Sequence, residues 1–179
     1  MNKYEKALLD LIAWAEGTLG VSQNGYDVVV DFYRIVGWTP DTDIVHGGYE
    51  WNMPSDSNST AAGRYQFKFD TWKEVNGNKN VPMTKENQDK SAIKKAKQRL
   101  TSNRIDKRPV NINELHIRSK FNIMMNKLSP EWASFPLSSD ITINGELRKA
   151  GDSYHSGQAK RGKTIDDFYA IYLKALDLY

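Results

Sequence analysis

A helical pattern that ends at a glycine constrains the fold of this chain more than any other segment. From Tyr4 to Ala15, apolar side chains recur at the spacing of one helix face, with charged residues between them. Gly17 is the residue type that ends a helix in a left-handed cap. We therefore expect an amphipathic helix over residues 3–15, which places the carboxyl group of Glu16 at its C-terminal end.

Glu16 has the surroundings expected of a proton donor. The negative end of a helix dipole and bulky apolar neighbours both penalise an ionised carboxylate, so we expect the pKa of Glu16 to be raised. A carboxylic acid that stays protonated near neutral pH is what general acid cleavage of a glycosidic bond requires. A single glutamate at a helix end is more often an ordinary surface residue, and these residues alone leave that alternative open.

Further periodic segments predict a mostly helical chain with little β structure. The β-branched and aromatic run 26–33 and the shorter segment 140–147 are typical of strands. Helices around a small β element define an α+β fold, and the length suits a single domain over residues 1–179. Apolar spacing and capping residues predict five more helices. One spans 64–76 and ends at Gly77, and the next spans 88–100 after a cap at Thr84. The others run from a capping box of Asn111 and Glu114 to Leu128, from Ser129 for a short distance, and from Thr164 to 176.

Five short blocks follow one another in order along the chain: AWAEGT at 13–18, GYDV at 25–28, STAAGRYQ at 59–66, WASFP at 132–136 and SYHSGQ at 153–158. Together they resemble the signature blocks of the lambda-phage endolysin family of peptidoglycan lytic transglycosylases. The resemblance extends over nearly the whole chain. Residues 31–58 look longer than the family pattern, and residues 137–151 look like an insertion.

The resemblance implies a lysozyme-like α+β fold whose small β element flanks the active-site groove. It also implies an enzyme that cleaves the β-1,4 bond between N-acetylmuramic acid and N-acetylglucosamine without water. In that reaction Glu16 gives a proton to the departing oxygen and then accepts one from the C6 hydroxyl of the muramyl sugar, which closes a 1,6-anhydro ring. The substrate is the glycan strand of peptidoglycan.

The same blocks carry the candidate substrate-binding residues. The Gln66 amide can hydrogen-bond an N-acetyl group or a ring hydroxyl, and the resemblance adds Tyr26 and Asp27 as groove residues. Tyr154 and Gln158 stand among glycine and serine, as in a loop that approaches a sugar closely. Each of the five also has an ordinary structural reading. Trp38 and Trp51, in a polar loop region, are the candidates for stacking on sugars, whereas Trp14, Trp72 and Trp132 fall on core-facing positions.

Two other functions remain as alternatives. Hydrolytic phage muramidases place a second catalytic aspartate and a threonine after the glutamate, at positions that Gly25 and Asp31 occupy here. That pattern fails, although other aspartates nearby keep hydrolysis open. A non-catalytic glycan-binding module is the second alternative, but it would be expected to lack Glu16.

Composition bounds the partners and the location. The chain has no cysteine, and its three histidines lack the spacing of a metal site, so we expect neither a metal nor another cofactor. No signal peptide or membrane-spanning segment is predicted. We therefore expect a monomer made in the host cytoplasm that reaches the cell wall, in the periplasm, after release, with carriage on the virion tail as the alternative.

A basic segment, residues 85–108, holds nine lysines and arginines against three acidic residues in a chain of net charge +3. Attraction to an anionic polymer, either cell wall or nucleic acid, is one interpretation. The simpler interpretation is a solvated helix face, and we expect no nucleic-acid partner.

Overall fold

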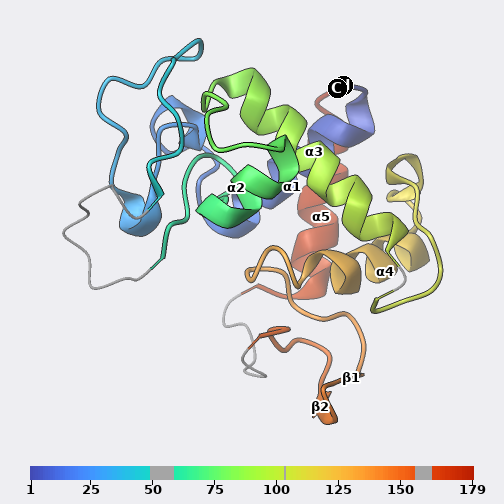
Figure 1. Cartoon of the computed structure of the whole chain (residues 1–179). Coiled ribbons are helices and arrows are strands. Elements are labelled where there is room, and N and C mark those ends of the chain that lie inside the picture. The colour runs from blue at the N-terminus through green and yellow to red at the C-terminus, as the bar shows by residue number, and fades with distance from the viewer. Residues whose placement is uncertain (49–58, 103, 156–162) are drawn as a thin grey trace. The chain divides into compact units, whose positions relative to one another are not determined.

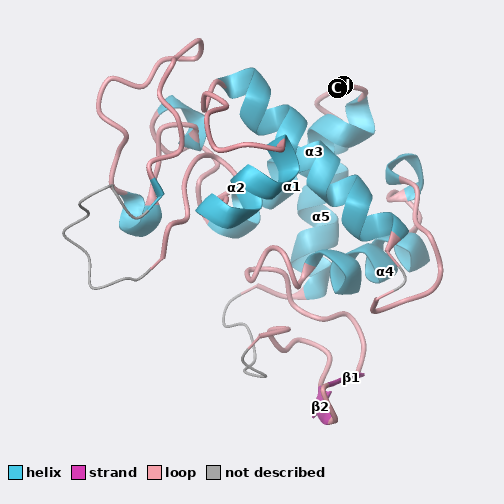
Figure 2. Ribbon diagram, in the orientation of Figure 1, coloured by secondary structure: helices cyan, strands magenta, loops and turns pink. Residues whose placement is uncertain are grey.

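The computed structural model describes residues 1–48, 59–102, 104–155 and 163–179. The chain divides into two compact units, a terminal unit of Met1–Ala15 with Ala96–Tyr179 and a central unit of Glu16–Lys95. The described residues are mostly helical, with a small antiparallel sheet, so the predicted α+β class is confirmed (Figure 2). The helices α1, Lys3–Glu16, and α3, Lys85–Thr101, each cross from one unit into the other along the sequence.

Helix α1 forms where the periodicity predicts it and supplies core side chains to the terminal unit. Its first turn is held by a reciprocal pair of bonds. The Asn2 Oδ1 accepts from the Glu5 N–H, and the Glu5 Oε2 accepts from the Asn2 N–H, both at 3.0 Å. Further along, Leu8, Leu11 and Ile12 are fully buried. The apolar face of α1 therefore lies in the core, as expected.

Two more helices complete the core of the terminal unit, α4, Arg118–Leu128, and α5, Ile165–Leu176, which pack together (Figure 1). Phe121 of α4 meets the rings of Tyr169 and Tyr172 of α5 at 4.9 and 5.6 Å between centroids. A capping box between Thr164 and Asp167 begins α5, which confirms that prediction.

Three local predictions for the terminal unit are wrong in detail. Asn111 caps a short 3₁₀ helix, Ile112–Glu114, and α4 begins separately at Arg118. The residues after Ser129 form turns rather than a helix. The single strand expected at 140–147 is a hairpin of β1, Ile141–Ile143, and β2, Glu146–Arg148. Its turn, Asn144-Gly145, has positive φ at both residues, 51° and 84°, as a two-residue hairpin loop requires.

In the central unit, α2, Phe69–Asn76, ends at Gly77 in the left-handed conformation, as predicted. It begins later than expected because residues 62–67 form a tight turn closed by hydrogen bonds between Ala62 and Phe67. Thr84 caps α3, since its Oγ1 accepts from the Asn87 N–H at 3.0 Å.

The strand predicted at 26–33 is wrong. Only isolated bridges form, between Val28 and Arg34 and between Val29 and Ala62. The chain reverses at Asp31 and Phe32, whose φ angles of 58° and 61° are left-handed. A β-branched run describes side chains that suit a sheet, but a strand also needs a continuous partner, which this segment lacks.

Candidate active site

Glu16 is the last residue of α1, and the helix stops there as predicted, with Gly17 at φ 80°. The Glu16 side chain is half-buried. The carbonyl oxygens that precede it, those of Trp14 and Ala15, accept hydrogen bonds from the Lys163 ammonium at 2.9 and 3.0 Å. A cation at this end of a helix opposes the negative end of the dipole, and no local pattern around Glu16 predicts it.

The segment after Glu16 is tied to a second predicted block. Thr18 is buried, and its hydroxyl donates to the backbone carbonyl of Arg64 at 2.5 Å. Gly25, at φ 86°, packs on the other side of Thr18, where a Cβ on Gly25 would lie 2.6 Å from the Thr18 carbonyl oxygen. Only glycine fits this approach. Three blocks that are distant in sequence thus meet at Thr18, two residues after the candidate acid.

Gln88, fully buried on α3, holds two of these blocks together. Its Oε1 accepts from the Arg64 N–H at 2.9 Å, and its Nε2 donates to the carbonyls of Tyr26 and Met83 at 3.0 and 2.8 Å. A Cβ on Gly63 would lie 2.2 Å from the same Oε1. The glycine of the GRYQ block is therefore needed so that the backbone can reach Gln88.

Tyr26 is buried in a polar network beneath this turn. The hydroxyls of Tyr26 and Tyr65 both donate to the Oδ1 of Asp89, at 2.7 and 2.6 Å. Burial and the bond to Asp89 raise the pKa of Tyr26, and burial with the charge of Asp89 raises the pKa of Tyr65 well above its usual range. The Arg64 guanidinium lies over the Tyr26 ring, 5.2 Å from its centroid. These contacts give Tyr26 a supporting position, with its hydroxyl engaged inside the protein.

Asp27 is 6% exposed, and only one of its two carboxylate oxygens has a hydrogen-bond partner among the described residues. Its Oδ2 accepts from the Ser22 hydroxyl at 2.9 Å, and that Ser22 oxygen in turn accepts from the Arg34 guanidinium at 2.5 Å. The other oxygen, Oδ1, is buried without a hydrogen-bond partner among the described residues. An unsatisfied buried carboxylate oxygen is costly and points to a function.

Gln66 closes the turn in an unusual backbone conformation. Its φ is 48°, which is left-handed and unfavourable for a residue with a side chain. Its backbone N–H and its side-chain Nε2 both donate to the Gly63 carbonyl, at 3.1 and 3.0 Å. The side-chain Oε1 accepts no hydrogen bond within the described part of the chain. The structure thus holds the half-buried amide in place with one acceptor open.

Trp38 does not occupy the exposed position that the sequence predicts for a sugar-stacking residue. Trp38 is 8% exposed, donates its indole N–H to the Met83 carbonyl at 2.8 Å and stacks on Tyr26 with an interplanar angle of 6°. It is therefore a core residue rather than an exposed platform for sugars, because the loop that contains it folds against α3. Trp51, the other candidate, lies outside the described residues. Trp72 and Trp132 are buried, as expected.

Tyr154 belongs to the terminal unit, where it lines a pocket of about 370 Å³ beside β1. Its ring meets that of His155 edge-on at 5.2 Å. Gln158 lies outside the described residues, so its predicted role stays a prediction.

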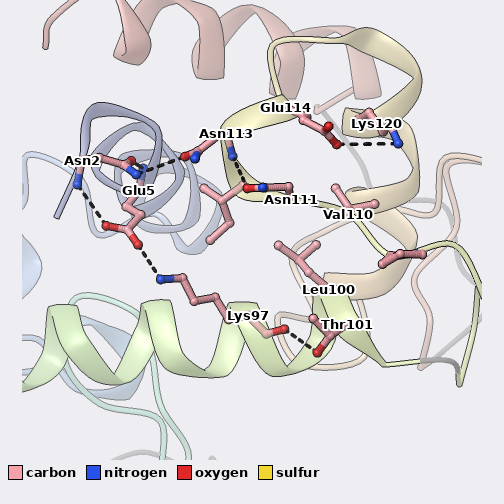
Figure 3. Close-up of a pocket in the computed structure, with 12 residues that line it drawn as sticks. Asn2, Glu5, Lys97, Leu100, Thr101, Val110, Asn111, Asn113, Glu114 and Lys120 are labelled. Atoms are coloured by element: carbon pink, nitrogen blue, oxygen red, sulfur yellow. Dashed lines mark hydrogen bonds and ion pairs between the residues drawn. The ribbon is translucent and has the colours of Figure 1, made fainter.

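A larger pocket of about 580 Å³ in the terminal unit contains none of the predicted site residues (Figure 3). Its charged side chains pair with each other: Lys97 with Glu5 at 2.6 Å, and Lys120 with Glu114 at 3.6 Å. The Asn2 amide also donates to the Asn113 Oδ1 at 3.0 Å. This polar wall ties the start of α1 to the end of α3 and to residue 113, which is a structural role.

Other groups of the protein engage the cations of the basic segment, although Lys94 and Lys97 are exposed. Lys94 donates to the Val75 carbonyl at 2.6 Å, and Lys97 pairs with Glu5. Lys95, 4% exposed, pairs with Glu74 at 3.2 Å. Intramolecular contacts thus engage seven of the nine cations of the segment, because Lys85, Lys90, Arg99 and Arg108 also form ion pairs.

Sequence reasoning missed Gln88 and Asp89 because it considered only the cations and the apolar side of that helix. A signal was present, since both lie four residues before Ala92 and Ile93, on the stripe that continues to Ala96. A polar pair on a buried stripe predicts buried hydrogen bonds. No local signal marks Lys163, which is distant in sequence from the helix end it caps.

The described residues contain no group of three or more histidine, aspartate or glutamate side chains that could hold a metal ion. His46, which the sequence left unassigned, is 2% exposed. Its Nδ1 accepts from the Gly48 N–H at 3.1 Å, so Nε2 carries the proton and donates to the Phe67 carbonyl at 2.8 Å. No helix among the described residues is long and apolar enough to cross a membrane.

Comparison with known proteins gives one family and one fold. A family model described as Endolysin matches residues 6–174. The lysozyme of bacteriophage lambda, complexed with a chitohexasaccharide, is 22% identical; the match covers 98% of this chain and 95% of that one, with a TM-score of 0.58. A second structure of lysozyme from bacteriophage lambda is 21% identical over the same shares, with a TM-score of 0.57. The lysozyme-like fold is thus confirmed, while no curated protein matches the chain.

Proposed function

The chain belongs to the endolysin family, and from that membership we propose that it cleaves the glycan strands of peptidoglycan with Glu16 as the catalytic group. The observation that carries the proposal is the position of Glu16, half-buried at the end of α1 and two residues before the buried Thr18–Arg64 contact. A lysozyme of the same fold is complexed with a chitohexasaccharide, which supports a glycan as the ligand. The proposed site of action is the cell wall.

The proposed reaction is lytic transglycosylation of the β-1,4 bond between N-acetylmuramic acid and N-acetylglucosamine. The carboxylic acid of Glu16 protonates the departing glycosidic oxygen while positive charge develops at C1 of the muramyl sugar. The Glu16 carboxylate then accepts the proton of the C6 hydroxyl, whose oxygen bonds to C1. The products are a 1,6-anhydro-muramyl end and a free hydroxyl on the departing sugar, with no water consumed.

Two features support this route over the hydrolytic phage pattern. Gly25 occupies the position of the second carboxylate in that pattern, and the close contact with Thr18 leaves no space for any side chain. Asp31, at the next position of the pattern, is exposed in the left-handed turn. One glutamate that serves first as acid and then as base needs neither residue.

Hydrolysis is the second candidate, and Asp27 is the observation that favours it. A buried carboxylate is the type of group whose charge a hydrolase can use to stabilise an oxocarbenium-like transition state. In the transglycosylation route, Asp27 instead supports the site through Ser22, because its Oδ1 is enclosed by the protein. The two routes assign different chemistry to the same side chain.

For the remaining predicted residues we propose roles that follow their contacts. Gln66 offers its open Oε1 to a sugar N–H or hydroxyl, with the Gly63 contact fixing its direction. Tyr26 supports the site from below, through Arg64 and Asp89. Tyr154, and Gln158 outside the described residues, remain proposed contacts to the strand.

The test combines one variant with product analysis. Glu16→Gln keeps the side-chain shape but cannot transfer a proton, so cleavage of purified sacculi should fall by about 10²–10⁴-fold with little change in thermal stability. Activity within a few-fold of the wild type would show that Glu16 is not the catalytic group. Mass spectrometry of the wild-type products distinguishes the routes, because a 1,6-anhydro end is lighter than a reducing end by one water. Reducing ends alone would establish hydrolysis.

A further inference from the structure

The pocket beside β1 differs from the larger pocket because its polar side chains lack partners within the described residues. It is lined by Arg104, Ile105, Tyr154 and the four consecutive residues 141–144. Neither the Arg104 guanidinium nor the Tyr154 hydroxyl has a hydrogen-bond or ion-pair partner among the described residues. In the pocket of Figure 3, by contrast, the charged side chains pair with each other. The β1 pocket therefore presents polar groups that are available to a ligand.

The backbone of β1 adds a hydrogen-bond donor and an acceptor to the same pocket. The hairpin register pairs Ile143 with Glu146 across the two-residue turn and Thr142 with Leu147 next to it. In an antiparallel pair, hydrogen-bonded and non-hydrogen-bonded positions alternate, and the residues that flank such a turn are hydrogen-bonded. The N–H and C=O of Thr142 therefore point away from β2, toward the free edge of β1. A free strand edge is a template for another extended peptide.

We propose that this pocket binds the peptide stem of peptidoglycan. The outward N–H and C=O of Thr142 pair with the C=O and N–H of one extended stem residue, and Arg104 binds a stem carboxylate. The proposal rests on the proposed function, which brings a peptide-bearing glycan strand to the protein. It gives a role to a hairpin that lies within residues 137–151, the segment that departs from the family pattern in sequence.

The chemistry of the pocket favours a peptide over a sugar. A strand edge offers a donor and an acceptor that match the C=O and N–H of one residue of an extended peptide, and the guanidinium fork matches a carboxylate. The stem carries both features, whereas the sugar rings supply hydroxyls and amides but not a peptide repeat.

The first test compares two substrates that differ only in the stems: glycan strands that carry their peptides, and the same strands after an amidase has removed them. For Arg104→Gln, the ratio of KM on peptide-bearing strands to KM on denuded strands should rise about three- to tenfold, as expected for the loss of one exposed charge-assisted contact. Lys107→Gln removes an exposed cation of the same segment that does not line the pocket, and should leave the ratio at the wild-type value.

The second test addresses the strand edge. Thr142→Pro removes the outward N–H without removing a bond of the hairpin ladder, since that N–H does not face β2. It should raise the same KM ratio, whereas Thr142→Val, which keeps the N–H and the side-chain shape, should not. Circular dichroism of both variants checks that the fold is retained. If Thr142→Pro does not fold, Arg104→Gln alone decides the test.

A direct probe separates this proposal from the proposed function. We expect the amide NMR signal of Thr142 to shift when the wild type is titrated with the synthetic tripeptide L-Ala-γ-D-Glu-L-Lys. The shift should be lost in Arg104→Gln and with a tripeptide whose carboxylates are amidated. No shift together with an unchanged KM ratio would overturn the proposal. Equal increases of KM on both strand types would show that the pocket binds sugar instead. Failure to cleave either strand would refute the proposed function, while the tripeptide titration would still test the pocket.

Discussion

Replacing Gln88 with leucine should destabilise the central unit and disturb the turn that carries Gln66. The fully buried Gln88 amide makes three hydrogen bonds to backbone groups, those of Arg64, Tyr26 and Met83. Leucine has nearly the same volume as glutamine and a similar helix propensity, so neither altered packing nor altered helix propensity should dominate the loss of stability. The effect therefore isolates the hydrogen bonds.

The magnitude follows from which backbone groups lose their partner. The Met83 carbonyl also accepts from the Trp38 indole at 2.8 Å, so it remains satisfied. The Arg64 N–H and the Tyr26 carbonyl lose the Gln88 partner inside the core. An unsatisfied buried backbone group costs about 1–3 kcal/mol, so the free energy of unfolding should fall by about 2–6 kcal/mol.

Urea unfolding measured by tryptophan fluorescence tests this expectation, with Gln98→Leu as the matched control. Gln98 lies on the exposed side of the same helix, where the substitution should change stability by less than about 0.5 kcal/mol. Hydrogen exchange at the Arg64 amide should accelerate in Gln88→Leu and stay protected in the control. If the two variants are equally stable and the Arg64 amide keeps its protection, the reasoning about the Gln88 bonds is wrong.

Four further predictions concern other contacts of the protein. Gly25→Ala should lower stability by more than about 1 kcal/mol and reduce cleavage, because φ is 86° and the new Cβ would meet the Thr18 carbonyl; equal thermal melting of variant and wild type would contradict this. Burial lowers the pKa of His46 below its usual 6.5, so the unfolded chain binds more protons at this residue than the folded chain does. The free energy of unfolding should therefore fall as the pH drops below about 6.5. His46→Gln should lack this part of the pH dependence in acid unfolding curves. Lys95→Gln should destabilise the protein, whereas Lys90→Gln, in an exposed pair with Glu86, should be nearly neutral in a thermal melt. The Gln variants of Lys94, Lys95 and Lys97 should clear turbid cell suspensions at a constant rate relative to the wild type across a salt series, because these cations are engaged within the protein. A difference at low salt that disappears at high salt would instead indicate electrostatic steering.

The helices could be predicted because their signals are local. Periodicity and a terminal glycine place α1 and α2, and side-chain caps at Thr84 and Thr164 place the start of α3 and α5. The strands could not be predicted as well. The run 26–33 has strand-forming residues, but Asp31 and Phe32 turn the chain back before a ladder can form. The Asn144-Gly145 pair was the readable signal of a hairpin in the segment interpreted as one strand.

The sequence by itself determined where the candidate acid lies along the chain. The apolar stripe of α1, its glycine stop and five ordered blocks place Glu16 at a helix end and indicate the family, because all of these are patterns among near neighbours. Only the tertiary structure decided what surrounds the blocks. Gln88 and Asp89 hold Tyr26 and the 63–66 turn, and Lys163 caps the helix before Glu16. Each of these contacts joins residues far apart in sequence, and a buried hydrogen bond depends on where two backbones meet, which no local pattern records.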